Sequence, residues 1–287
     1  MIFKQTIHLG LSPCPNDCFI FDALIHHKID TKGLTFVPYM GDVEDLNLKA
    51  QKATLDVTKL SFNAYFGTLA HYVLLNAGAA LGKGCGPLLV SKDFIPLELL
   101  SKTLLNIGIP GKYTTANLLL SFAFPNQTNK TELLFSDIED ALISNKINAG
   151  LLIHENRFTY PSRGLQLIQD LGSYWESKTG FPIPLGGIAI RRSLPFELQQ
   201  VINDLIQESV LFAFNDPASS RGFVKANAQA MDEQVMKQHI ELYVNDYSVQ
   251  LGPIGRQAIE LLHDQFRQQQ GQVDKSDSNR LFFNTIT

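Results

Sequence analysis

The sequence predicts an α/β protein built from two lobes. Short apolar runs alternate with longer helical stretches along the 287 residues, a pattern typical of helices packed on sheets with largely parallel strands. At roughly 150 residues per domain, this length suggests two domains. Because 45% of the residues are hydrophobic, the chain can bury a sizeable core.

Eight apolar runs are predicted to be strands. They span residues 7–11, 34–38, 57–60, 72–75, 88–91, 105–109, 149–153 and 187–191. Helices are predicted over residues 17–26, 43–53, 62–68, 115–123, 136–145 and 195–215, followed by a C-terminal series of helices from residue 218 to about residue 268.

The position of two predicted strands indicates how the lobes are connected. Residues 88–91 leave the first half of the chain, and residues 187–191 follow a complete second α/β unit. If both strands cross between lobes, residues 1–88 and 188–287 form a discontinuous larger lobe and residues 89–187 form a smaller lobe. A two-stranded hinge then joins them, with a ligand cleft between. Two domains in simple succession are the alternative.

A glycine-rich stretch precedes the first predicted hinge strand, at residues 78–86. It runs into a strand, so it fits neither the dinucleotide-binding fingerprint nor the phosphate-binding P-loop. A flexible connection or a close approach of two backbones at the hinge is expected there instead.

Charge and composition exclude several classes of partner. The chain has 24 Lys and Arg against 28 Asp and Glu, a net charge of −4, which provides no positive field for nucleic acid or an anionic membrane. No segment reaches the ~18 apolar residues of a membrane span, and the N-terminus lacks the pattern of a signal peptide. Three cysteines do not form a disulfide framework. A cytoplasmic protein with a small-molecule ligand is therefore expected.

Candidate site residues are the polar side chains that directly follow predicted strands, because ligands collect beyond the carboxyl ends of strands in open α/β sheets. After the first strand, Asn16 and Asp17 can contact a ligand or cap the next helix. Cys14 and Cys18 lie four residues apart, but no histidine stands nearby in the sequence at ligand spacing, so buried thiols are favoured and no metal is expected.

Two further segments could bind an anion. Lys59 and Ser61 end a short strand, where the lysine would bring a positive charge to the cleft unless it is an ordinary solvated surface residue. Thr114 and Thr115 open a helix whose free N–H groups and dipole favour a carboxylate or phosphate. A helix cap formed by either threonine is the simpler alternative.

The segment after residues 149–153 is the candidate for catalysis. His154 stands where this apolar strand should emerge into the cleft, and an imidazole with a pKa near ~6.5 can act as a base close to neutral pH. A purely structural, hydrogen-bonded histidine is the alternative. Arg157 can orient an anionic substrate or form a salt bridge within the lobe. Glu155 should point away from the cleft if the backbone stays extended. The remaining histidines show no metal-ligand pattern and are interpreted as structural.

Taken together, these segments resemble a known enzyme family. The runs SPCPNDCFIFDALIHHKI, TKLSFNAY, GKGCGPLLV, PGKYTTANLLL, GLLIHENRFTYPSRGL and DLGSYWESKTGFPIPLG occur in the order and approximate spacing of the 1,4-dihydroxy-6-naphthoate synthases, clearly from residue 5 to about residue 190. Cys18 departs from the threonine usual in that family.

The resemblance implies a periplasmic-binding-protein type II-like fold and a cofactor-independent lyase of the futalosine route to menaquinone. The substrate implied is cyclic dehypoxanthine futalosine. The resemblance also implies His154 as the proton-abstracting base and a substrate site that includes Lys59, Leu60, Ser61, Thr114 and Thr115. A solute-binding protein and the sister chorismate dehydratase are the competing hypotheses.

Overall fold

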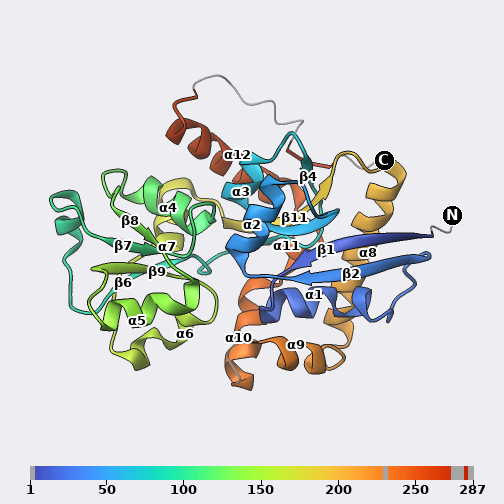
Figure 1. Ribbon diagram of the computed structural model, residues 1–287, viewed down its shortest axis with the longest axis horizontal. Helices are drawn as coiled ribbons and strands as arrows, with labels where there is room; N and C mark the ends of the chain where they lie inside the picture. The colour runs from blue at the N-terminus through green and yellow to red at the C-terminus, as the bar shows by residue number, and fades with distance from the viewer. Residues whose placement is uncertain (1–3, 229–231, 273–280, 284–287) are drawn as a thin grey trace.

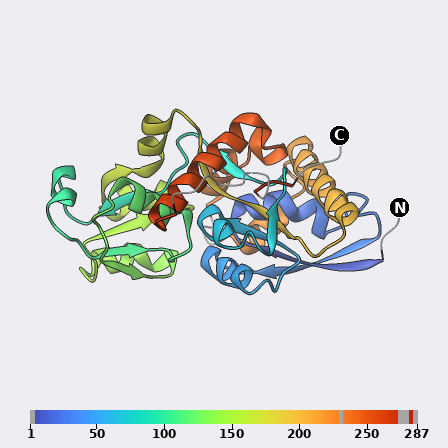
Figure 2. The same ribbon diagram turned by 90° about the horizontal axis from the view of Figure 1, so that it is seen from above.

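The computed structural model describes residues 4–228, 232–272 and 281–283. Two sheets lie side by side along the long axis of the molecule, each flanked by helices (Figures 1 and 2). Two buried clusters pack on the two faces of the first sheet, and one of them continues into the second lobe, which also holds a smaller third cluster.

The first sheet contains six strands in the order β2-β1-β3-β11-β4, with β5 also paired to β11. Their bounds are β1 (Gln5–Leu11), β2 (Leu34–Met40), β3 (Val57–Ser61), β4 (Tyr72–Leu74), β5 (Ala80–Gly82) and β11 (Ile183–Arg191). The helices between these strands are α1 (Pro15–Ile25), α2 (Val43–Gln51) and α3 (Phe62–Gly67).

The second sheet has the strand order β10-β6-β9-β7-β8. Its strands are β6 (Leu88–Ser91), β7 (Ile107–Ile109), β8 (Lys130–Glu132), β9 (Ala149–Leu152) and β10 (Gln166–Asp170). Its helices are α4 (Thr115–Ala123), α5 (Ile138–Ile143), α6 (Asn156–Thr159) and α7 (Leu171–Thr179), with short 3-10 segments at Leu97–Ser101, Phe135–Asp137 and Tyr160–Arg163.

The C-terminal helices return to the first lobe and also reach the second. They are α8 (Phe196–Asn215), α9 (Arg221–Asn227), α10 (Glu233–Tyr243), α11 (Asp246–Val249) and α12 (Gly252–Gln269). Helix α1 is buried along nearly its whole length because α8, α9 and α10 pack against it. Helix α12 contacts α3 of the first lobe and α4 of the second, so it lies across the boundary between them.

The sheets are mixed, and the expectation of largely parallel strands was wrong. Pairs β1-β2, β1-β3, β7-β8 and β7-β9 are parallel, whereas β6 and β11 run antiparallel to their neighbours. The parallel strands end at the boundary between the lobes, but β6 and β11 enter from that boundary after a crossing. Their direction is therefore opposite, as a two-stranded hinge requires.

All eight predicted strands are present, with some changes at their ends. The run at residues 105–109 forms a strand only from Ile107. The strand predicted at residues 187–191 begins earlier, at Ile183. The chain therefore pairs with the first sheet again five residues before residue 188, where its return was predicted. Strands β5, β8 and β10 and helices α6 and α7 were not predicted. Strand β8 has the polar sequence KTE, so no apolar pattern marks it.

The backbone crosses between the lobes at residues 83–87, between β5 and β6, and again at residues 180–182, between α7 and β11. A Cβ atom added to Gly86 would lie 2.3 Å from the Cα atom of Gly172 at the start of α7, so the first crossing contacts the second lobe backbone to backbone. This contact confirms the close approach expected of the glycine-rich stretch, since only glycine leaves room for it. Among the described helices, none is both long and apolar enough to span a membrane.

Candidate active site

A cavity of about 100 Å³ lies between the lobes, within about 630 Å³ of empty space that includes the part open to solvent. Both lobes contribute to its wall. The lining residues are Asn16, Val43, Lys59, Leu60, Ser61, Ala80, Cys85, Pro87, Thr114, Thr115, Ala116, Ile153, His154, Leu185, Gly186, His239 and Tyr243. The loops after β1, β3, β7 and β9 therefore meet here, as their positions at strand ends predicted.

The loop after β1 is organised around the carboxylate of Asp17. One oxygen accepts hydrogen bonds from the backbone N–H and hydroxyl of Ser12 at 3.0 and 2.8 Å. The other accepts from the Asn16 amide at 2.9 Å and from the Lys59 ammonium at 3.0 Å. The prediction that Asn16 or Asp17 caps the helix was wrong, because α1 begins at Pro15 and its N-cap, Cys14, makes no side-chain capping bond. Asn16 lines the cavity instead, and the Asp17 carboxylate holds Lys59 in the cavity wall.

Lys59 lies in the cavity wall with only 11% of its side chain exposed, so the solvated-surface alternative does not apply. Its charge is already balanced by Asp17, and it contributes less net positive charge than the sequence suggested. The hydroxyl of Ser61 accepts a hydrogen bond from the Asn47 amide at 3.2 Å. Leu60 adds an apolar surface between these two polar residues.

The start of α4 faces the cavity from the second lobe. Thr114 is the N-cap, and its hydroxyl accepts from the N–H of Asn117 at 3.3 Å, so the capping interpretation is confirmed. The hydroxyl of Thr115 donates to the carbonyl of Leu185 in β11 at 2.6 Å, a bond that links the lobes. The carboxylate of Glu44 accepts a hydrogen bond from the N–H of Tyr113 at 2.9 Å. An acidic side chain of the first lobe therefore contacts the turn that precedes α4.

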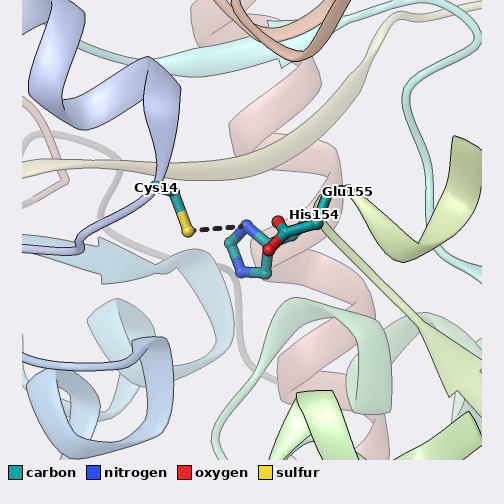
Figure 3. Close-up of side chains that lie close together, drawn as sticks. All are labelled: Cys14, His154 and Glu155. Carbon is teal, nitrogen blue, oxygen red and sulfur yellow. Dashed lines mark hydrogen bonds between the residues drawn. The ribbon is translucent and has the colours of Figure 1, made fainter. Parts of the chain in front are cut away.

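His154 lies at the cavity two residues after the end of β9, with backbone φ of 54° in the left-handed region. Its Nδ1 lies 3.3 Å from the Sγ of Cys14 in the opposite lobe (Figure 3). Its ring also contacts Phe135, with centroids 5.0 Å apart. Burial lowers the pKa of His154 below its usual 6.5, and the negative charge of Glu155 partly opposes this effect. The imidazole is therefore neutral at pH 7.

Glu155 does not point away, as its position after an extended strand had suggested. The left-handed turn at His154 ends the extended backbone, so the alternation of side chains stops there. Figure 3 shows the Glu155 carboxylate beside His154 and facing the same side as Cys14. A carboxylate oxygen of Glu155 and the ligand atoms of Cys14 and His154 all lie within 4.8 Å of one another.

His239, which the sequence offered only as a structural residue, also lines the cavity. It is fully buried, and its ring stacks on that of His154 with centroids 5.9 Å apart and planes 4° apart. The amide orientation of Asn16 is set by Asp17, so its oxygen accepts from Nε2–H of His239 at 2.9 Å. The Nδ1 of His239 is then a lone-pair acceptor, 4.0 Å from a Glu155 carboxylate oxygen.

Arg157 is not part of the cavity wall. Its guanidinium donates to the carbonyl of Gly86 at 3.0 Å and lies 3.6 Å from the Asp170 carboxylate. It therefore ties the second lobe to the first crossing segment, which matches the salt-bridge alternative. Direct contact with a substrate, the other possibility raised by the sequence, stays a prediction.

A family model described as menaquinone biosynthesis matches residues 7–268 of the chain. The chain belongs to this family. A 1,4-dihydroxy-6-naphthoate synthase from Thermus thermophilus is 39% identical over 258 residues, which cover 90% of this chain and 93% of that protein. The enzyme of the same name from Streptomyces coelicolor is 39% identical over 260 residues, 89% and 90% of the two chains. The resemblance drawn from the sequence motifs is thus confirmed.

Solved structures share the fold of this family member. Protein AF1704 from Archaeoglobus fulgidus is 34% identical and superimposes with a TM-score of 0.86 over 93% of this chain and 98% of that one. The periplasmic aliphatic sulphonate binding protein SsuA from Escherichia coli is only 11% identical but has a TM-score of 0.68 over 98% and 92% of the chains. The predicted periplasmic-binding-protein-like fold is confirmed.

Proposed function

We propose that the protein is a 1,4-dihydroxy-6-naphthoate synthase, a lyase that converts cyclic dehypoxanthine futalosine to 1,4-dihydroxy-6-naphthoate for menaquinone. The observation that carries the proposal is the match over nine-tenths of the chain to two enzymes of that name. The fold alone would not distinguish an enzyme from a binding protein. In keeping with its composition, we assign the enzyme to the cytoplasm, and the family resemblance implies that it needs no cofactor.

In this proposal His154 is the general base. Its ring lies in the wall of the cavity and is neutral at pH 7 because burial lowers its pKa, so a lone pair is available to accept a proton. Removal of a substrate proton then allows a new aromatic ring to form as the sugar-derived fragment leaves. A positioned base of this kind contributes about 10²–10⁴-fold to a rate.

The polar residues of both lobes would hold the substrate. Ser61, Thr114 and Thr115 present hydroxyl groups at the cavity, while Leu60 packs against an apolar face. Lys59 is the one lysine or arginine among the residues that line the cavity, and its pairing with Asp17 fixes its ammonium group in position. We propose that the substrate carboxylate lies near the Lys59 ammonium and the N-terminus of α4, where the helix dipole favours an anion.

The test is incubation of the purified protein with cyclic dehypoxanthine futalosine, with the naphthoate product followed by chromatography. The proposal predicts product formation at a rate proportional to enzyme concentration. Tight binding without product would instead favour a solute-binding protein. No binding of this substrate, combined with dehydration of chorismate, would favour the sister enzyme, and either outcome contradicts the proposal.

A further inference from the structure

Three side chains of different chemistry converge beside the cavity. They are the thiol of Cys14 from the first lobe and the imidazole of His154 and carboxylate of Glu155 from the second (Figure 3). The Sγ and Nδ1 atoms are 3.3 Å apart. In a tetrahedral zinc site with Zn–S of about 2.3 Å and Zn–N of about 2.0–2.1 Å, the same two atoms are about 3.5 Å apart. The thiol and imidazole therefore already have the spacing of two zinc ligands.

Glu155 supplies the third ligand position. Glu155 is only 7% exposed, and its Oε2 atom is buried without a hydrogen-bond partner among the described residues. The Nδ1 of His239, 4.0 Å from that oxygen, also lacks a partner there. Two buried acceptors that face each other without a donor between them are costly and favour a bound cation or proton donor.

The donor set selects the type of cation. A thiolate and an imidazole prefer zinc-like ions, whereas Mg²⁺ and Ca²⁺ require mostly oxygen ligands. The carboxylate of Asp17, three residues from Cys14 in the sequence, adds negative charge nearby. The three ligands also leave a fourth position, so water or a ligand in the cavity could complete the coordination.

We propose that Cys14, His154 and Glu155 form a binding site for a thiophilic divalent cation such as Zn²⁺, and that the bound ion inhibits the enzyme. The thiol loses its proton to solvent when the sulfur binds the ion. A neutral imidazole has one lone pair, and when Nδ1 gives it to the metal the other nitrogen carries the proton. His154 can then no longer accept a proton. The inhibitory half of the proposal rests on the proposed function, but binding itself does not.

Binding is tested with the purified full-length protein and Co²⁺, whose thiolate complexes absorb in the near ultraviolet. The proposal predicts a charge-transfer band that saturates at one equivalent and is removed by Zn²⁺. Cys14→Ser should abolish the band, and Glu155→Gln should weaken binding by more than about 100-fold, because even residues that only support a ligand contribute 10–100-fold.

Cys18→Ser is the matched control. Its thiol is also buried and four residues from Cys14, but it donates to the carbonyl of Pro13 and lies outside the cluster. This variant should keep the band. If Cys14→Ser does not fold, Glu155→Gln decides the question, because it preserves the shape of the side chain. Absence of a saturable band in the wild type, or a band that survives in Cys14→Ser, would overturn the site.

The inhibitory half has its own readout. One equivalent of Zn²⁺ should stop turnover of cyclic dehypoxanthine futalosine, and a chelator should restore it. Cobalt binding together with undiminished turnover overturns inhibition alone. If the protein has no turnover at all, the proposed function fails while the cobalt spectrum still decides whether the metal site exists.

Discussion

The carboxylate of Asp17 should contribute more to stability than an exposed carboxylate in a similar ion pair. In Asp17→Asn the side chain keeps its shape but loses its charge. Four donors converge on the native carboxylate, from Ser12, Asn16 and Lys59. An amide has only one oxygen, so its NH₂ group must face two of these donors. The substitution also leaves the ammonium of Lys59, which is 11% exposed, without its anion.

Removing one partner of a buried ion pair costs about 3–5 kcal/mol, so we expect a decrease of that size in the free energy of unfolding. Urea unfolding followed by circular dichroism at pH 7 measures it. The control is Asp30→Asn, because Asp30 pairs with Lys32 at 2.8 Å but both side chains are exposed. That variant should be indistinguishable from the wild type, as is usual for surface pairs.

The double variant Asp17→Asn with Lys59→Met separates charge from packing. Since it removes the stranded cation as well, it should be more stable than the sum of the two single variants predicts. Equal effects of Asp17→Asn and Asp30→Asn would refute the argument that this carboxylate organises the cleft wall.

Two further predictions concern the hinge and the effect of pH. Gly86→Ala places a Cβ 2.3 Å from the backbone of Gly172, so its melting temperature in thermal unfolding should be markedly lower than that of the wild type. Gly222→Ala is the control, because an added Cβ there meets nothing within 4 Å and should have little effect or stabilise slightly. Equal melting temperatures of the two variants would contradict the contact between Gly86 and Gly172. Burial lowers the pKa of His263 from 6.5 to about 4, so the unfolded chain binds more protons between these values and stability falls as the pH decreases from about 6.5 towards 4. His263→Gln should reduce this slope of unfolding free energy against pH by up to about 1 kcal/mol per pH unit, and an unchanged slope would contradict the assignment.

Much of the site was predictable because it lies at strand ends. Asn16, Lys59, Thr115 and His154 each follow an apolar run, and the carboxyl ends of the parallel strands bring them to one boundary. Strands with clear apolar runs were predictable for the same reason. Strand β8, with its polar sequence KTE, forms only because it pairs with β7.

Other features depend on contacts that no local pattern encodes. Glu155 was misplaced because its predicted direction assumed an extended backbone, and a histidine with positive φ is not suggested by its neighbours. His239 is separated from its partner Asn16 by 223 residues, so only the folded C-terminal helix α10 brings it to the cavity. Cys14 likewise contacts His154, which lies in the other lobe and 140 residues away in the sequence.

The central claim is that this family member catalyses the naphthoate-forming reaction with His154 as its base. The most direct measurement compares turnover of cyclic dehypoxanthine futalosine by the wild type and by His154→Asn, with substrate affinity determined by calorimetry for both. The account predicts turnover in the wild type, a decrease of at least about 10²-fold in the variant, and similar affinity for both proteins. Near-normal turnover by His154→Asn would contradict it.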